Sequence, residues 1–202
     1  MKRRTGRGRI SAAGGNGFAG GGGGRVSINV FSRHDDLKFL VHGGRSFGCP
    51  ENSGAAGTYY DAVPRRLIVS NHNLSTDTDT LLLEFPNQPL WTNVYVLNHA
   101  KASVPLLWSR VQVIEVQGQL HLSCGAVLSF GLAHYASSEF ELMAEELLMS
   151  DSVIKASGRQ YVFSIVFWLV IYCPMVSWAK ASSSKPPLIA SCSSTTLVHL
   201  NI

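Results

Sequence analysis

Short stretches in which apolar and polar residues alternate recur between residues 26 and 135. The first is Arg-Val-Ser-Ile-Asn-Val, in which Val26, Ile28 and Val30 alternate with polar neighbours. Such alternation predicts half-buried β-strands, because successive side chains of a strand point to opposite faces. Clusters of Gly, Pro, Asn and Asp separate the stretches and are typical of turns. The pattern therefore predicts a mainly β region, with further strands at Leu37–Val41, Thr58–Tyr60, Leu67–Val69, Leu81–Phe85, Trp91–Leu97, Val111–Val116 and Gln119–Leu122.

A loose internal repeat places glycine directly before these β-rich runs. Gly-Gly-Arg-Val-Ser-Ile begins at Gly23, and Ala-Gly-Thr-Tyr-Tyr begins at Ala56, 33 residues later. A weaker copy, Gly-Gln-Leu-His-Leu, begins at Gly118. Repeats of this length are typical of solenoids, in which each rung stacks on the rung before it. We therefore expect residues 25–135 to form a β-solenoid-like region. A β-sandwich, which gives similar alternation, is the alternative.

Residues 137–150 carry the strongest signal for a soluble helix. Ser138 and Glu141 have the spacing of a capping box, and the stretch is rich in Leu, Met, Ala and Glu. Phe140 and Leu142 also alternate with acidic residues, as they would in a strand. We expect residues 136–157 to form a short helix, or else a final rung.

The run from Tyr161 to Ala179 is the most hydrophobic part of the chain. It contains 19 residues without a charge, which is the length that crosses a hydrocarbon core of about 30 Å as a helix. The run predicts a C-terminal transmembrane helix within residues 158–180, and the lipid bilayer as the partner of this segment. Basic residues flank the run evenly, so they indicate no orientation.

Glycine and charge are distributed unevenly, and this changes the picture at the two ends. Fifteen of the 19 glycines lie at or before Gly57, and residues 1–25 hold six Lys or Arg and no acid. The run from Gly14 to Gly24 has one large apolar side chain, Phe18, so it cannot bury enough surface to offset its ordering entropy. We therefore expect a disordered basic segment at 1–24 and a disordered tail at 181–202. The basic segment predicts nonspecific attraction to polyanions and no specific nucleic-acid partner.

Two glycine motifs resemble functional signatures without their structural context. Gly44-Arg-Ser-Phe-Gly48 matches the nucleophile elbow of hydrolases, with Ser46 as the nucleophile and His72, His99, Asp61 and Asp77 as available partners. That motif needs a helix after it, and a loop sequence follows here. The run from Gly15 to Gly20 matches a dinucleotide fingerprint with Asp35 downstream, but more glycine follows in place of a helix. We expect a glycine-rich turn and a low-complexity segment, and no catalytic or cofactor-binding residues.

Candidate metal and modification sites are equally weak. Asp77 and Asp79 lie among hydroxyl residues and could hold calcium, but they are more typical of an exposed strand edge. The four cysteines, Cys49, Cys124, Cys173 and Cys192, lack zinc-site spacing, so we expect no metal. Asn73-Leu-Ser75 is a glycosylation sequon that has meaning only in a lumenal segment.

Three long stretches resemble a known family. They are SAAGGNGFAGGGGGRVSINVFSRHDD, VHGGRSFGCPENSGAAGTYYDAVPRRLIVSNHNLSTDTDTLLLEFP and LSFGLAHYASSEFELMAEELLMSDSVIK. They look like part of the very large plant glycine-rich proteins, often labelled glycine-rich or ephrin-receptor-like. The likeness covers roughly residues 8–155, is that of an internal piece, and stops after Lys155. It implies β-solenoid-like repeats in a secreted or membrane-anchored protein, and it carries over no catalytic residues.

Together these patterns predict a structural or interaction protein that is associated with a membrane and is not an enzyme. The alternative is a carbohydrate-binding or carbohydrate-active β-solenoid of the extracellular matrix or cell wall. In that alternative, Asp77 and Asp79 would meet sugars together with Tyr59, Tyr60 and Trp91. This second hypothesis rests on fold analogy alone.

Overall fold

The computed structural model describes residues 3–82, 91–105, 111–131 and 139–156, together with the strands at 163–170, 175–178 and 188–193. In these residues the regular structure is all β, and no α-helix is present. The strands are β1 (Arg3–Ser11), β2 (Arg25–Ile28), β3 (Ser32–Leu40), β4 (Gly57–Asp61), β5 (Arg66–Ser70), β6 (Thr80–Leu81), β7 (Asn93–Leu97), β8 (Lys101–Pro105), β9 (Val111–Gly131), β10 (Glu139–Ala156), β11 (Phe163–Val170), β12 (Met175–Trp178) and β13 (Leu188–Ser193).

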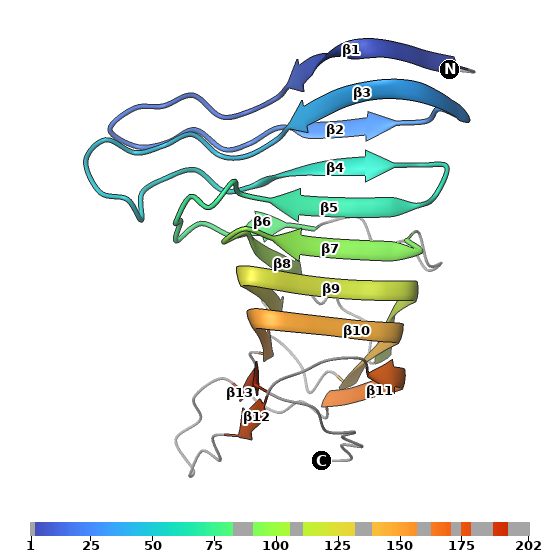
Figure 1. Ribbon diagram of the computed structural model, residues 1–202. Helices are drawn as coiled ribbons and strands as arrows, with labels where there is room; N and C mark the ends of the chain where they lie inside the picture. Colours follow the sequence, from blue (N-terminus) through green and yellow to red (C-terminus); the bar gives the residue numbers. More distant parts are fainter. Residues whose placement is uncertain are drawn as a thin grey trace.

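The strands stack in chain order as the rungs of a β-solenoid-like coil (Figure 1). One sheet runs through the molecule in the order β2-β4-β5-β7-β9-β10. Arg25 pairs with Thr58 in parallel, 33 residues on, which is the repeat that the glycine-then-strand pattern predicts. Further along the sheet, Leu67 of β5 pairs with Val94 of β7, and Val94 pairs with Leu120 of β9. The expectation of a β-solenoid-like fold is therefore confirmed in preference to the β-sandwich.

The core forms because inward side chains of successive rungs lie above one another. Strand β5 alternates buried and half-buried residues, as does β7. The inward-facing residues of β5, β7, β9 and β10 form two columns along one wall of the coil, and all of them are buried. One column comprises Leu67, Val94, Leu120 and Leu147, and the other comprises Val69, Val96, Leu122 and Met149. The facing wall, built by β8 and the later halves of β9 and β10, contributes Ala102, Leu128 and Phe130. Each added rung thus buries the apolar surface of the previous one.

The direction of the chain within the common sheet changes at the β4–β5 hairpin. Strands β2 and β4 are parallel, β4 and β5 are antiparallel, and β5, β7, β9 and β10 are again parallel to one another. Tyr60 of β4 packs against the main core. Its neighbour Tyr59 stacks on Phe39 of β3, with ring centroids 4.6 Å apart. Since adjacent residues of a strand face opposite ways, the β1–β3 sheet covers one face of the common sheet and the main core covers the other.

Two regions differ from the expectations above. Residues 3–24, expected to be disordered, are ordered as β1 and a hydrogen-bonded loop that leads to β2, because hydrogen bonds to the next rung replace the missing apolar burial. Residues 139–156 form strand β10, the final-rung alternative, and not the helix. There the pairing with β9 places Leu142, Ala144 and Leu147 in the core, so that tertiary packing overrides the helical propensity.

The hydrophobic run at Tyr161–Ala179 is described in two strands. Phe163–Val170 forms β11, which pairs with β10, and Met175–Trp178 forms β12, which pairs with β13. The expected C-terminal helix is therefore not seen in these residues, and the rest of the run lies outside the described residues. Among the described residues, no helix is long and apolar enough to cross a bilayer. Of the tail at 181–202, expected to be disordered, Leu188–Ser193 is strand β13 and the remainder lies outside the described residues.

Candidate functional site

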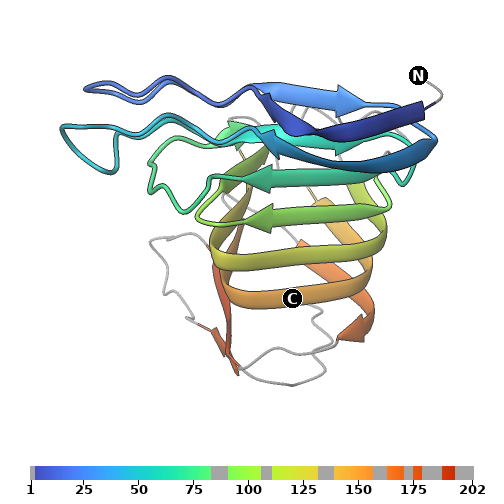
Figure 2. The ribbon, with the colours of Figure 1, turned by 45° about the horizontal axis from the view of Figure 1, so that its top comes forward.

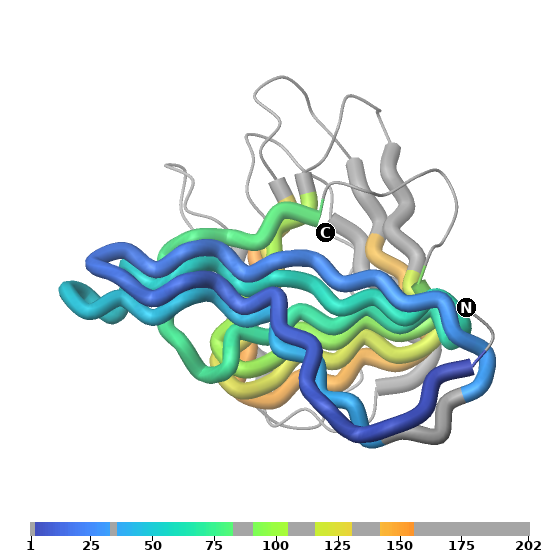
Figure 3. Tube along the Cα trace, turned by 90° about the horizontal axis from the view of Figure 1, so that it is seen from above, coloured from blue at the N-terminus to red at the C-terminus, as the bar shows by residue number. Residues whose placement is uncertain are grey.

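The most distinctive feature of the molecule is a projection that we call the glycine arm. It consists of the loops 12–24 and 41–56, which lie side by side; each runs out from the β stack and turns back to it (Figures 2 and 3). Its backbone hydrogen bonds repeat every third residue: Gly21 N donates to Gly15 O and Gly24 N to Ala12 O. Gly54 N donates to Gly44 O in the same way. A three-residue period is that of the polyproline II helix, whereas a β-strand has a period of two.

Glycine is required at the positions where these segments touch. A Cβ at Gly14 would overlap the carbonyl oxygen of Gly21, and a Cβ at Gly20 would overlap that of Gly44. The same overlap with backbone occurs at Gly23, Gly54 and Gly57. Gly20 and Gly23 are three residues apart, as are Gly54 and Gly57, the first residue of β4, so the glycines that face neighbouring backbone recur every third residue. The crowding matches the reason for glycine at every third position of collagen.

Ser46, the residue of the predicted nucleophile elbow, lies inside the arm and is 5% exposed. Its hydroxyl donates to the carbonyl oxygen of Phe18 on the previous rung at 2.6 Å, and accepts from Cys49 N at 3.2 Å. Its own N–H donates to the hydroxyl of Ser53. A nucleophilic serine bonds to a general base and stands open to substrate. Ser46 has neither property here, since its partners are backbone groups and another serine.

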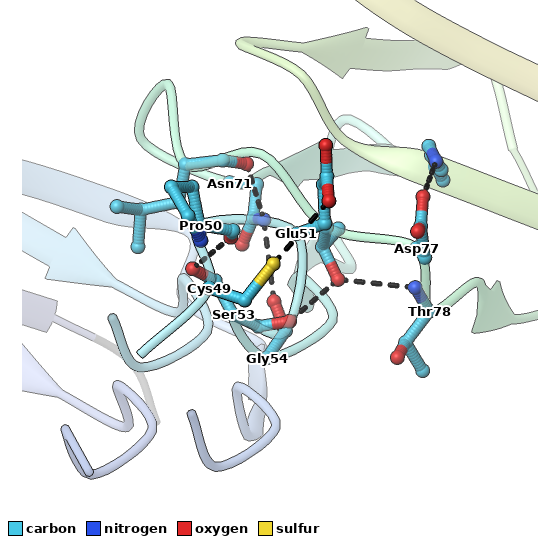
Figure 4. A network of polar contacts seen from close by, with 11 residues as sticks. Cys49, Pro50, Glu51, Ser53, Gly54, Asn71, Asp77 and Thr78 are labelled. Carbon is cyan, nitrogen blue, oxygen red and sulfur yellow. Dashed lines mark hydrogen bonds and ion pairs between the residues drawn. The ribbon is translucent and has the colours of Figure 1, made fainter. Parts of the chain in front are cut away.

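A network of buried polar side chains links Ser46, through Ser53, to the body of the solenoid. Figure 4 shows Ser53 and Asn71 of this network. Asn71 is completely buried. Its side-chain oxygen accepts from Gly43 N at 2.9 Å, and its amide nitrogen donates to Leu74 O at 2.9 Å and to Gly54 O at 3.3 Å. Thr76 and Thr80 donate their hydroxyls to Ser53 O and Ala56 O. All of these bonds satisfy backbone groups, and all except the local bond from Asn71 to Leu74 O reach a neighbouring segment, so the network joins one rung to the next.

The acidic residues proposed for calcium or sugar lie on the surface of this network. Asp77 forms an ion pair with Lys101 of the next rung, with Asp77 Oδ1 3.0 Å from Lys101 Nζ. Asp79 is exposed. Cys49 lies beside Glu51, with 3.3 Å between Sγ and Oε2. In the part of the chain that the structure describes, no three His, Cys, Asp or Glu side chains converge as a metal site would require.

The aromatic residues proposed for sugar binding do not form a common platform. Trp91 is 8% exposed and belongs to the core. Tyr60 packs on that core, while Tyr59 is covered by Phe39 and its hydroxyl donates to Asp61. The histidines proposed as partners for Ser46 are likewise dispersed: His72 lies beside His42, and His99 N donates to Cys124 O.

The sequence singled out Ser46 and missed Asn71, Ser53, Thr76 and Thr80. These four are buried. The sequence places Asn71 in a turn cluster and places Thr76 and Thr80 in the stretch expected to be an exposed edge, because nothing in it shows that these loops lie against another rung. A usable signal is the spacing from Gly43 to Asn71, since their separation of 28 positions is close to one rung. Asn73, of the glycosylation sequon, is exposed in the loop that follows Asn71.

The fold and this network define a β-solenoid-like protein with a glycine arm. Comparison with family models, with curated proteins and with solved structures finds no match to the chain. The resemblance to the large plant glycine-rich proteins therefore stays a prediction.

Proposed function

We propose that this chain is a noncatalytic β-solenoid that serves as a structural or interaction scaffold. The observation that supports this most directly is that its buried polar side chains form hydrogen bonds with backbone groups. Ser46, Asn71 and Thr76 each bond to the backbone of a neighbouring segment. Side chains that form such bonds stabilise the stacked rungs and are not available to bind a substrate.

The shape of the molecule also favours a scaffold. Stacked rungs give long, flat outer faces, and the glycine arm extends one end of them (Figure 2). On the outer face of the common sheet, Tyr95 lies between Arg66 and His121, with its ring 5.3 Å from the Arg66 guanidinium carbon. Elongated faces of this kind are the surfaces that solenoid proteins use to bind partners.

Labelling with a fluorophosphonate tests the proposal, because such a probe reacts with an activated serine. We expect no labelling of the full chain. We also expect Ser46→Ala to lower the free energy of unfolding by about 1–3 kcal/mol, since the Phe18 carbonyl oxygen loses its donor. Stoichiometric labelling of the folded chain that disappears in Ser46→Ala would show a hydrolase-type serine and defeat the proposal.

Membrane association through Tyr161–Ala179 is the second part of the proposal. It is supported by the 19 uncharged residues of this run, which would partition into a bilayer wherever they form a helix. The membrane would then hold the C-terminal end of the chain and leave the solenoid free to meet partners.

A further inference from the structure

The outward face of the β1–β3 sheet carries a row of basic and hydroxyl side chains. Along β1, alternate residues share one face, and all five on this face are exposed. They are Arg3, Thr5, Arg7, Arg9 and Ser11. On the other face of β1, Arg4 points toward the common sheet, because its guanidinium carbon lies 5.1 Å from the centre of the Phe39 ring, which in turn stacks on Tyr59. Ile10, further along that face, is 41% exposed.

The arginines of this row have no partners among the described residues. Arg3, Arg7 and Arg9 make no ion pair or side-chain hydrogen bond there. On β3, the residues opposite Arg7 and Arg9 are Asp36 and Lys38, and both are exposed. The five described charges of the face therefore comprise four cations and one anion.

The row follows a strand that curves around the end of the stack (Figure 3). Alternate residues of a strand lie about 6.8 Å apart, so the path along β1 from Arg3 to Arg9 is about 20 Å long. The two hydroxyl residues, Thr5 and Ser11, lie in the same line as the arginines. A ligand that meets the whole row must be an extended chain that bears negative charges and hydrogen-bonding groups at intervals.

We propose that this face binds a linear acidic polysaccharide. The planar guanidinium fork pairs with a carboxylate or sulfate group through two parallel hydrogen bonds, and the hydroxyls of Thr5 and Ser11 match those of a sugar chain. Single-stranded nucleic acid is the less suitable polyanion, because its binding sites stack bases on aromatic side chains. The aromatic residue of β3, Phe39, lies on the opposite face. The inference rests on the proposed scaffold function only in that it needs the first rungs to be folded.

The simplest competing explanation is that the charges protect an edge. Strand β1 pairs with β3 on one side and with no described strand on the other. Edge strands often carry charged residues that prevent pairing with another chain. In that case any cation would serve, and no polysaccharide would bind with measurable preference.

The test measures binding of polygalacturonate to the full chain by titration calorimetry, with neutral dextran as the ligand control. The variant Arg7→Gln/Arg9→Gln should weaken binding at least about tenfold, because two charge-assisted contacts are lost. The matched control is Arg45→Gln/Arg65→Gln, which removes two exposed arginines elsewhere and leaves the same net charge. It should change the affinity less than about twofold. Arg7→Lys/Arg9→Lys keeps the charge, lacks the fork, and should fall between the two.

Three results would overturn the inference. Equal weakening by both Gln pairs would show attraction to net charge alone. Tighter binding of single-stranded DNA than of polygalacturonate would show a nucleic-acid surface. Absence of binding by a chain whose arm amides are protected from hydrogen exchange would leave only the edge-protecting role. Serine labelling would defeat the scaffold proposal without affecting any of these results, so the two can fail separately.

Discussion

At the scale of single residues, glycine in the arm acts by occupying little space. Gly15 and Gly20 lie in the same glycine-rich run and have no positive φ. They differ in their surroundings, because a Cβ at Gly20 would overlap the Gly44 carbonyl oxygen whereas a Cβ at Gly15 meets nothing within 4 Å. Composition alone treats the two as equivalent.

This contrast gives a matched pair of substitutions. Gly20→Ala should lower the free energy of unfolding by about 1–3 kcal/mol, because backbone has to shift to admit the methyl group. Gly15→Ala should be neutral or stabilise by up to about 1 kcal/mol, since it restricts the unfolded chain without a clash. Urea unfolding of the full chain measures both. Equal effects of the two substitutions would mean that the arm segments are not in contact.

The sequence predicted little of the candidate site at this scale. Ser46 stands out through a motif that belongs to a different local structure, and Asn71 lies in one of the Asn-containing clusters that are typical of turns. The role of both depends on a partner more than 20 residues away, Phe18 for Ser46 and Gly43 for Asn71. A contact between residues on different rungs produces no local sequence pattern, so it cannot be predicted from the neighbouring residues.

At the scale of elements, the arm differs from the strands in its hydrogen-bond period. The amides of Gly14, Gly17, Gly20 and Gly23 donate to the next rung, three residues apart along the chain. The amides of Gly15 and Gly22 donate to no described backbone group.

Hydrogen exchange at residue resolution should therefore show protection at every third residue along 14–23, together with Gly21, whose amide donates to Gly15 O. Protection is expected at Gly14, Gly17, Gly20 and Gly23, because an amide must lose its bond before it exchanges. Fast exchange is expected at Gly15 and Gly22, which serve as internal controls. Uniformly fast exchange across the run would show that the segment is disordered, as its composition predicts.

Elements with an alternating apolar pattern were predictable, and the others were not. Val26 and Ile28 of β2 and Leu67 and Val69 of β5 follow the pattern of half-buried strands. The arm has almost no apolar side chains, so a method based on burial assigns it to disorder. Strand β10 misleads in another way, because its Leu, Met, Ala and Glu residues favour a helix until β9 is present to pair with it.

At the scale of the whole molecule, the glycine-then-strand repeat predicted the coil, and the C-terminal run remains to be tested. We predict that Tyr161–Ala179 directs the chain into microsomal membranes so that it resists carbonate extraction. Trp168→Asp/Val170→Lys should release it, since a charge at the centre of a span costs about 2.5–3.5 kcal/mol. Pro174→Ala, a control near one end of the run, should have little effect. If the unaltered chain is extracted like the double variant, the run belongs to the solenoid as β11 and β12.

The β4–β5 hairpin has a consequence for how rungs could be added to either end. The rungs before it lie on one side of the common sheet and the rungs after it lie on the other. Packed sheets lie about 10 Å apart, so the axes of the two coils are offset laterally by about that distance. A longer array built by repeating rungs above and below would therefore be a stepped rod. Two partner molecules, one bound along each half of the rod, would therefore be offset laterally by the distance between two packed sheets.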